Sequence, residues 1–327
     1  MSDNRGGVGS IARRSGVLVA IFGLALTLVG CKEESKVQPP SDSAVVNSAS
    51  PSDSQTNGID RPNADVLPES VRFAKGVLFK PDVDAPADDM WMAPLIVAEV
   101  HKASDASTEA PFGSLTSNAS KLPGVDGTKP AVYSFHDTVE LNGVRYRRAT
   151  YVWFYPIAPS KALSVSGVAV VSNEDNEPVL WHVFDTARAG KDQIYIAHSV
   201  EHNAKLEHGP PLVGRRFAVE TSDPSSSVDV VRIIEDGPEP MGPMVYVAAE
   251  PRHVATLACR CMNSQVDEIL DARFYRLIQL ETNVAQTGSL SEQVQNFFET
   301  NGITLDERLE AFLSRDLNAC LRLPATL

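Results

Sequence analysis

The sequence predicts an α+β domain in which a C-terminal three-helix segment packs on a mainly antiparallel sheet, and three observations support this. Between 131 and 262, short runs rich in Val, Ile and aromatic residues are separated by turn residues, as in strands joined by tight connections. From 263 to 327 the apolar residues recur at helical spacing instead. A composition of 43% hydrophobic and 22% charged residues is that of a globular chain, long enough for one large domain or two small ones. We expect residues 66–327 to form a single domain, because the apolar faces of the helices need the sheet as a partner.

The N-terminal residues 1–30 carry the features of a secretory signal peptide. Arg13 and Arg14 precede an apolar run over 17–29, which is too short to cross a bilayer but has the length of a signal-peptide core. The run ends in Leu28-Val29-Gly30-Cys31. This pattern resembles the lipobox of bacterial lipoproteins, and the resemblance covers this end of the chain alone. It implies cleavage before Cys31, a diacylglyceryl group on its thiol and acylation of the new amino terminus.

The same resemblance implies a location and a tether. A chain with these lipids is anchored at the cell envelope, and Lys32 after the cysteine is similar to lipoproteins sorted to the outer membrane, facing the periplasm, in Gram-negative cells. Residues 31–65 hold the lipidated cysteine followed by a stretch rich in Ser, Pro, Asp and Asn and almost free of large apolar side chains. Because such a stretch buries too little surface to offset its ordering entropy, we expect a disordered spacer.

The net charge restricts the partners. At −13, with an isoelectric point near 5.0, the chain repels phosphate backbones, which argues against nucleic acid. The expected partners are the membrane, through the lipid anchor, and an envelope protein or polysaccharide.

The elements of the domain are expected in the following order. A helix runs from Asp88 to Lys102, and a long loop covers 103–130. Asn142-Gly143 predicts a hairpin turn between two strands. The expected strands cover 131–139, 145–155, 163–172, 179–184, 193–197, 217–221, 228–235, 244–249 and 255–261, with a short helix over about 200–208.

Three amphipathic helices are expected after these strands. Ser264 is the N-cap of the first, which carries apolar residues as far as 278. Ser289 and Thr304 begin capping boxes before the second and the third. The apolar faces of these helices need a partner, and the sheet is the expected one.

The segment His198-Ser199-Val200-Glu201-His202 has the H-x-x-E-H spacing and is similar to the inverzincin zinc-peptidase motif. On one helix, His198 and His202 stand a turn apart and bind zinc while Glu201 acts as the base, with Glu268 or Glu281 as the third ligand. The surrounding sequence predicts a different arrangement, because Ser199 is a good N-cap. We therefore expect His198 before the helix and the two imidazoles on different faces.

Cys259-Arg260-Cys261 is the second cluster that carries chemistry. On a strand, residues i and i+2 share a face, so both sulfurs, with His253 upstream, suit a metal such as zinc or copper. An oxidising compartment instead favours a disulfide of Cys320 with Cys259 or Cys261. Burial as reduced thiols is the third interpretation. All three stay open from the sequence.

The expected function is a non-catalytic binding or structural role at the cell envelope, without a cofactor. Two alternatives remain: a zinc-dependent hydrolase built on the histidine motif, and a metal- or thiol-handling protein built on the cysteines. The aromatic run 151–155, together with Trp181, is expected to pack in the core, and a ligand-binding face is its alternative.

Overall fold

The computed structural model describes the chain in segments between residues 73 and 327, all within one compact unit, Ile59–Leu327. The described segments are 73–82, 87–101, 110–117, 123–155, 164–186, 190–223, 225–250, 252–260, 266–280, 296–300 and 307–327. The signal peptide, Cys31 and the tether lie outside them, so the predictions about that end of the chain stay predictions.

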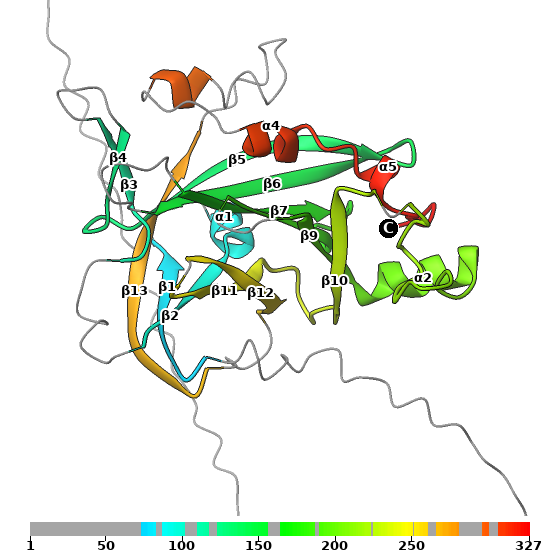
Figure 1. The fold of residues 1–327 in the computed structure, drawn as a ribbon, viewed down its shortest axis with the longest axis horizontal. Helices are drawn as coiled ribbons and strands as arrows, with labels where there is room; N and C mark the ends of the chain where they lie inside the picture. The colour runs from blue at the N-terminus through cyan, green and yellow to red at the C-terminus, as the bar shows by residue number, and fades with distance from the viewer. Residues whose placement is uncertain are drawn as a thin grey trace, which may run out of the picture. The chain divides into compact units, whose positions relative to one another are not determined.

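An 11-stranded mixed sheet, curled into a near-barrel, dominates the described residues (Figure 1). The strands follow one another in the order β10-β9-β8-β7-β6-β5-β13-β1-β2-β11-β12, and a separate hairpin is made by β3 and β4. The strands are β1 Lys75–Pro81, β2 Leu95–Glu99, β3 Ser114–Ser117, β4 Pro123–Asp126, β5 Ala131–Leu141, β6 Val144–Tyr155, β7 Ser164–Ser172, β8 Pro178–Asp185, β9 Asp192–Ala197, β10 Val228–Ile234, β11 Pro243–Ala248, β12 His253–Cys259 and β13 Glu268–Gln279.

The strands β5 to β9 form the antiparallel meander that the short connections between the apolar runs predict. The hairpin turn expected at Asn142-Gly143 is confirmed, with φ of 50° at Asn142 and 77° at Gly143. Two successive positive φ angles define the turn whose twist matches that of the strands it joins, and Asn-Gly adopts them at low cost. The Asn142 amide group also donates to the carbonyls of Leu323 and Pro324, which holds the C-terminal residues against this turn.

The expected first C-terminal helix is instead the strand β13, and the α+β prediction is wrong: the protein is mostly β. The first part of β13 pairs in parallel with β1, and its last residues pair in parallel with β5. Tyr275 is its one fully buried residue, whereas Phe274 is 56% exposed. Because the strand has no alternating buried face, its apolar residues fit helical spacing equally well. Within the residues that the structure describes, no three-helix segment packs on the sheet.

The helices of the described residues are short: α1 Ala87–Met92, α2 His198–His208, residues 296–300, α4 Glu307–Leu313 and α5 Leu317–Cys320. None of those we can describe has the length and apolar character needed to span a bilayer. The helix expected from Asp88 to Lys102 ends at Met92, two residues before Pro94, and β2 follows. A residue before proline avoids the helical region, which explains this early end.

Two other expectations in the middle of the chain are also wrong. The hairpin β3–β4 occupies part of the expected loop 103–130. The expected strand at 217–221 makes a single bridge, between Glu220 and Leu321. Its alternating apolar residues are anchored by other contacts, described below.

The two faces of the meander have different partners. From β6, Tyr151, Trp153 and Tyr155 point into the concave side of the near-barrel and belong to the largest core cluster. Val152 and Phe154 point to the other side, into a second cluster that includes Phe298 and residues of α4. Trp153 and Tyr151 are fully buried, so the aromatic run is core packing, as expected, and is not a surface for a ligand.

Candidate functional site

The histidine motif lies on one helix, contrary to expectation. The helix α2 begins at His198, with Ala197 at the N-cap, and the rings of His198 and His202 are 6.5 Å apart between centroids. The Ser199 side chain donates to Asp236 instead of capping the helix. His198 Nδ1 lies 3.7 Å from Glu235 Oε2. The prediction that the two imidazoles lie on different faces is therefore wrong.

Glu201, the expected base of that motif, points the other way. It is 2% exposed, and its carboxylate accepts hydrogen bonds from the Ala218 amide at 3.0 and 3.1 Å and from the Val219 amide at 3.4 Å. Lys205 Nζ lies 3.1 Å from Glu201 Oε1. The carboxylate thus ties α2 to residues 218–219, and it is not placed to activate a water on a metal held by the histidines.

The candidate third ligands do not join this motif. Glu268 begins β13 and lies 3.4 Å from Lys75 Nζ, and Glu281 lies outside the described residues. Within the described segments, no three His, Cys, Asp or Glu side chains converge as a metal site. The motif residues therefore do not fit the zinc-peptidase arrangement that their spacing resembles.

The cysteines separate into two environments. Cys259, at the end of β12, is disulfide-bonded, and Cys261 lies outside the described residues. Cys320 is a free thiol on α5, with its sulfur 3.6 Å from Ser227 Oγ. The disulfide of Cys320 with Cys259 or Cys261 is therefore not formed. Ser227 precedes β10, at one end of the sheet order, whereas Cys259 ends β12, at the other end. His253 begins β12 and takes part in no described metal site.

A buried polar network fixes the C-terminal residues to the meander. His182 on β8 and Asp192 on β9 lie 3.0 Å apart between Nε2 and Oδ2, and Arg315 donates to the same Asp192 oxygen at 2.8 Å. The His182 ring also packs at a tilt against Phe312 of α4, with 4.4 Å between ring centroids. His182 and Asp192 are nearly inaccessible, so this network stabilises the fold and is closed to a ligand.

The charges of this network predict acid sensitivity. Burial lowers the pKa of His182 below its ordinary 6.5, with the charges of Arg315 and Arg148 adding to the effect while Asp192 opposes it. Burial opposes the shift at Asp192, but His182 and Arg315 lower the pKa of that carboxyl. In the unfolded chain His182 binds a proton near its ordinary pKa, so protons favour unfolding below that value.

We therefore expect the urea midpoint of unfolding to fall as the pH is lowered from 7.5 to 5.5, because stability present above pH 6.5 is then lost. In His182→Gln the same pH change has a smaller effect on the midpoint. An equal change in the variant and in the unaltered protein would assign the acid sensitivity to other groups.

A second polar cluster joins β12 to the meander inside the near-barrel. Asp185 accepts hydrogen bonds from Ser166 Oγ at 2.8 Å and from the Val254 amide at 2.7 Å. Beside it, Trp153 Nε1 donates to Tyr155 OH at 2.8 Å, and burial raises the pKa of Tyr155. These groups are closed off from solvent. The hydrogen bonds of Asp185 hold β12 to the meander.

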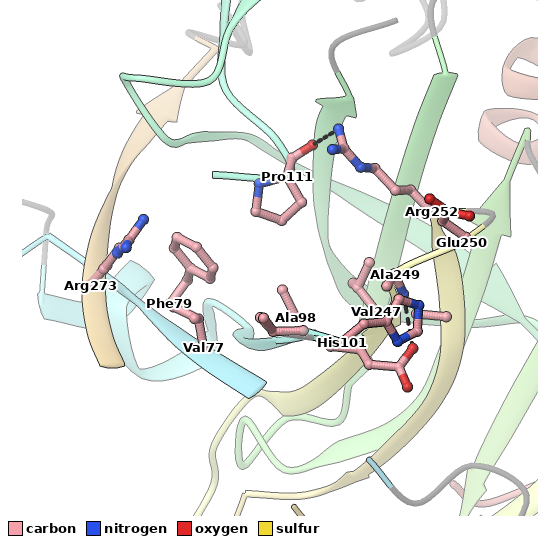
Figure 2. Close-up of a pocket in the computed structure, with 13 residues that line it drawn as sticks. Val77, Phe79, Ala98, His101, Pro111, Val247, Ala249, Glu250, Arg252 and Arg273 are labelled. Carbon is pink, nitrogen blue, oxygen red and sulfur yellow. Dashed lines mark hydrogen bonds between the residues drawn. The ribbon is translucent and has the colours of Figure 1, made fainter. Parts of the chain in front are cut away.

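The described part of the chain has an open cavity of about 270 Å³ that a small molecule can enter (Figure 2). It lies where the parallel strands β2 and β11 both end, at Glu99 and Ala248. The cavity could not be predicted from the sequence, because its lining comes from β1, β2, β11, β13 and the segments near Pro111 and Arg252. No local motif marks these positions.

The cavity has an apolar floor and a charged rim. Val77, Phe79, Ala98 and Val247 form the floor, and each is buried in the core. The rim carries the side chains of His101, Glu250, Arg252 and Arg273 (Figure 2), and Glu99 also lines the cavity. An apolar floor with a few polar groups at its edge is the usual construction of a small-molecule site.

Comparison with known proteins identifies no relative: no family model, no curated protein and no solved structure matches this chain.

Proposed function

We propose that this chain is a lipid-anchored protein of the bacterial cell envelope with a non-catalytic binding role. The observation that carries the proposal is the apolar run 17–29 leading directly into Leu28-Val29-Gly30-Cys31. Lipid on Cys31 would hold the protein at a membrane, and the stretch 32–65 would let the domain reach partners beside it. The acidic charge of the chain favours envelope partners over nucleic acid.

The side chains that suggest catalysis are closed off from a substrate. Glu201 is engaged by two backbone amides, and the His182–Asp192 pair is buried under Phe312. A catalytic group must reach its substrate, and these groups are closed off. The open cavity, in contrast, offers apolar surface with charges at its edge, which suits recognition of a ligand.

Lipid attachment at Cys31 gives a direct test. When the full chain is expressed in a Gram-negative bacterium fed with labelled palmitate, we expect label on the protein, and we expect Cys31→Ser to abolish it. The matched control is Cys320→Ser, which removes a free thiol of the folded domain and should keep the label. Labelling is a better measure than cell fractionation, because an uncleaved apolar segment also holds a chain at a membrane. Label retained in Cys31→Ser would refute the anchor.

A further inference from the structure

We propose that the cavity at the ends of β2 and β11 binds a small organic monocarboxylate with a short apolar body, and that Arg252 holds the carboxylate. This inference deepens the proposed binding role and rests on it.

The size and floor of the cavity define the apolar part of the ligand. A volume of about 270 Å³ is slightly below the roughly 300–1,000 Å³ that is usual for drug-sized ligands, so we expect a ligand smaller than these. Val77, Ala98 and Val247 form a row across three adjacent strands, because Val77 pairs with Ala98 and Ala98 pairs with Val247. Phe79 stands beside this row, with its ring packed edge-on against Phe112 at 5.0 Å. A phenyl group or a short branched alkyl chain suits such a surface.

The charged groups of the rim differ in how far they are already engaged. Arg273 Nε lies 2.8 Å from Asp271 Oδ2, so its charge is balanced. Glu99 accepts a hydrogen bond from the Ala249 amide at 3.0 Å. Arg252 donates from Nη1 to the Pro111 carbonyl at 3.1 Å, and no carboxylate of the described residues lies within ion-pair distance of it. The guanidinium of Arg252 is therefore oriented by a neutral partner and keeps further donors for a ligand.

The balance of charge favours a single negative charge on the ligand. A guanidinium presents its donors in a planar fork that matches a carboxylate. Glu99 and Glu250 line the same cavity and repel any anion, but they repel a doubly charged phosphate about twice as strongly as a monocarboxylate. Arg252 balances one charge, which points to a monocarboxylate over a phosphate or a neutral compound.

The test uses 3-phenylpropionate and ligand-observed NMR on the full chain in detergent micelles, with protein-free micelles as the blank. We expect 3-phenylpropionate to bind, and both its uncharged amide and propionate to bind at least about ten-fold more weakly, because each lacks one recognised part. Equal binding of the acid and the amide would overturn recognition by charge. Absence of binding by 3-phenylpropionate would overturn the proposal for the cavity.

Arg252→Gln and Arg273→Gln form a matched pair of variants. We expect Arg252→Gln to weaken binding of 3-phenylpropionate by about ten-fold or more, with a smaller effect in Arg273→Gln, because the charge of Arg273 is already balanced by Asp271. If Arg252→Gln does not fold, the comparison of the acid with its amide on the protein that keeps Arg252 still tests whether the carboxylate is recognised. A larger loss in Arg273→Gln would overturn the role of Arg252. Labelling by palmitate is independent of these results, so failure of the ligand proposal and failure of the anchor are distinguishable.

Discussion

Asp192→Asn is expected to lower the free energy of unfolding by about 3 kcal/mol, because it leaves the charge of Arg315 partly buried without its counterion. Removing one partner of a buried pair costs about 3–5 kcal/mol, and the side chain of Arg315 keeps 18% exposure, which places the effect at the lower end. Urea unfolding followed by tryptophan fluorescence measures it, since Trp153 and Trp181 are buried in the folded domain.

Two variants separate this effect from a general loss of an ion pair. Glu268→Gln removes an exposed pair with Lys75, and we expect a change within about 0.5 kcal/mol. Combining Asp192→Asn with Arg315→Met removes both charges, and the double variant should recover part of the loss. Equal effects of Asp192→Asn and Glu268→Gln would show that the buried network contributes no more than a surface pair.

Glu201→Ala is expected to lower the free energy of unfolding by about 3 kcal/mol, since it leaves the buried amides of Ala218 and Val219 without an acceptor. The effect should be local, because the carboxylate holds one segment to α2. We therefore expect faster hydrogen exchange at the amides of Ala218 and Val219.

The matched control is Glu207→Ala on the same helix. Glu207 is exposed and accepts one hydrogen bond, from the Ala325 amide, so its removal should cost no more than about 1 kcal/mol. Unchanged exchange at residues 218 and 219 in Glu201→Ala would contradict the anchoring role. Glu201→Ala also tests the zinc-hydrolase alternative based on the H-x-x-E-H spacing, because a zinc hydrolase without this base would lose activity at unchanged stability.

The sequence predicted the strands of the meander because each carries its own local signal. From β5 to β9 the buried and turn residues mark the strand ends, and Asn142-Gly143 specifies its turn without help from distant residues. The strand β13 carries no such signal. Its neighbours β1 and β5 supply its hydrogen bonds, and most of its side chains stay partly exposed, so only long-range pairing reveals it.

The sites follow the same division between local and distant information. The spacing of His198, Glu201 and His202 is visible in the sequence, but the direction of Glu201 is set by the amides of residues 218–219. The cavity was not predictable, because Phe79, Val247 and Arg252 come together only when the sheet has formed. A motif states which groups are close along the chain, and the fold decides which of them face the same way.

The double pairing of β13 has a consequence for how the chain folds. A polypeptide that emerges N-terminus first presents β1 early, yet Lys75 must wait for Glu268, and Ala131 must wait for Arg276. Contacts between such distant residues form slowly, since the entropy of closing the long intervening loop is lost before they are made. Until then β1 and β5 expose unpaired backbone at their edges, where another chain can add a strand. We therefore expect the newly made protein to depend on protection from aggregation until residue 279 has emerged.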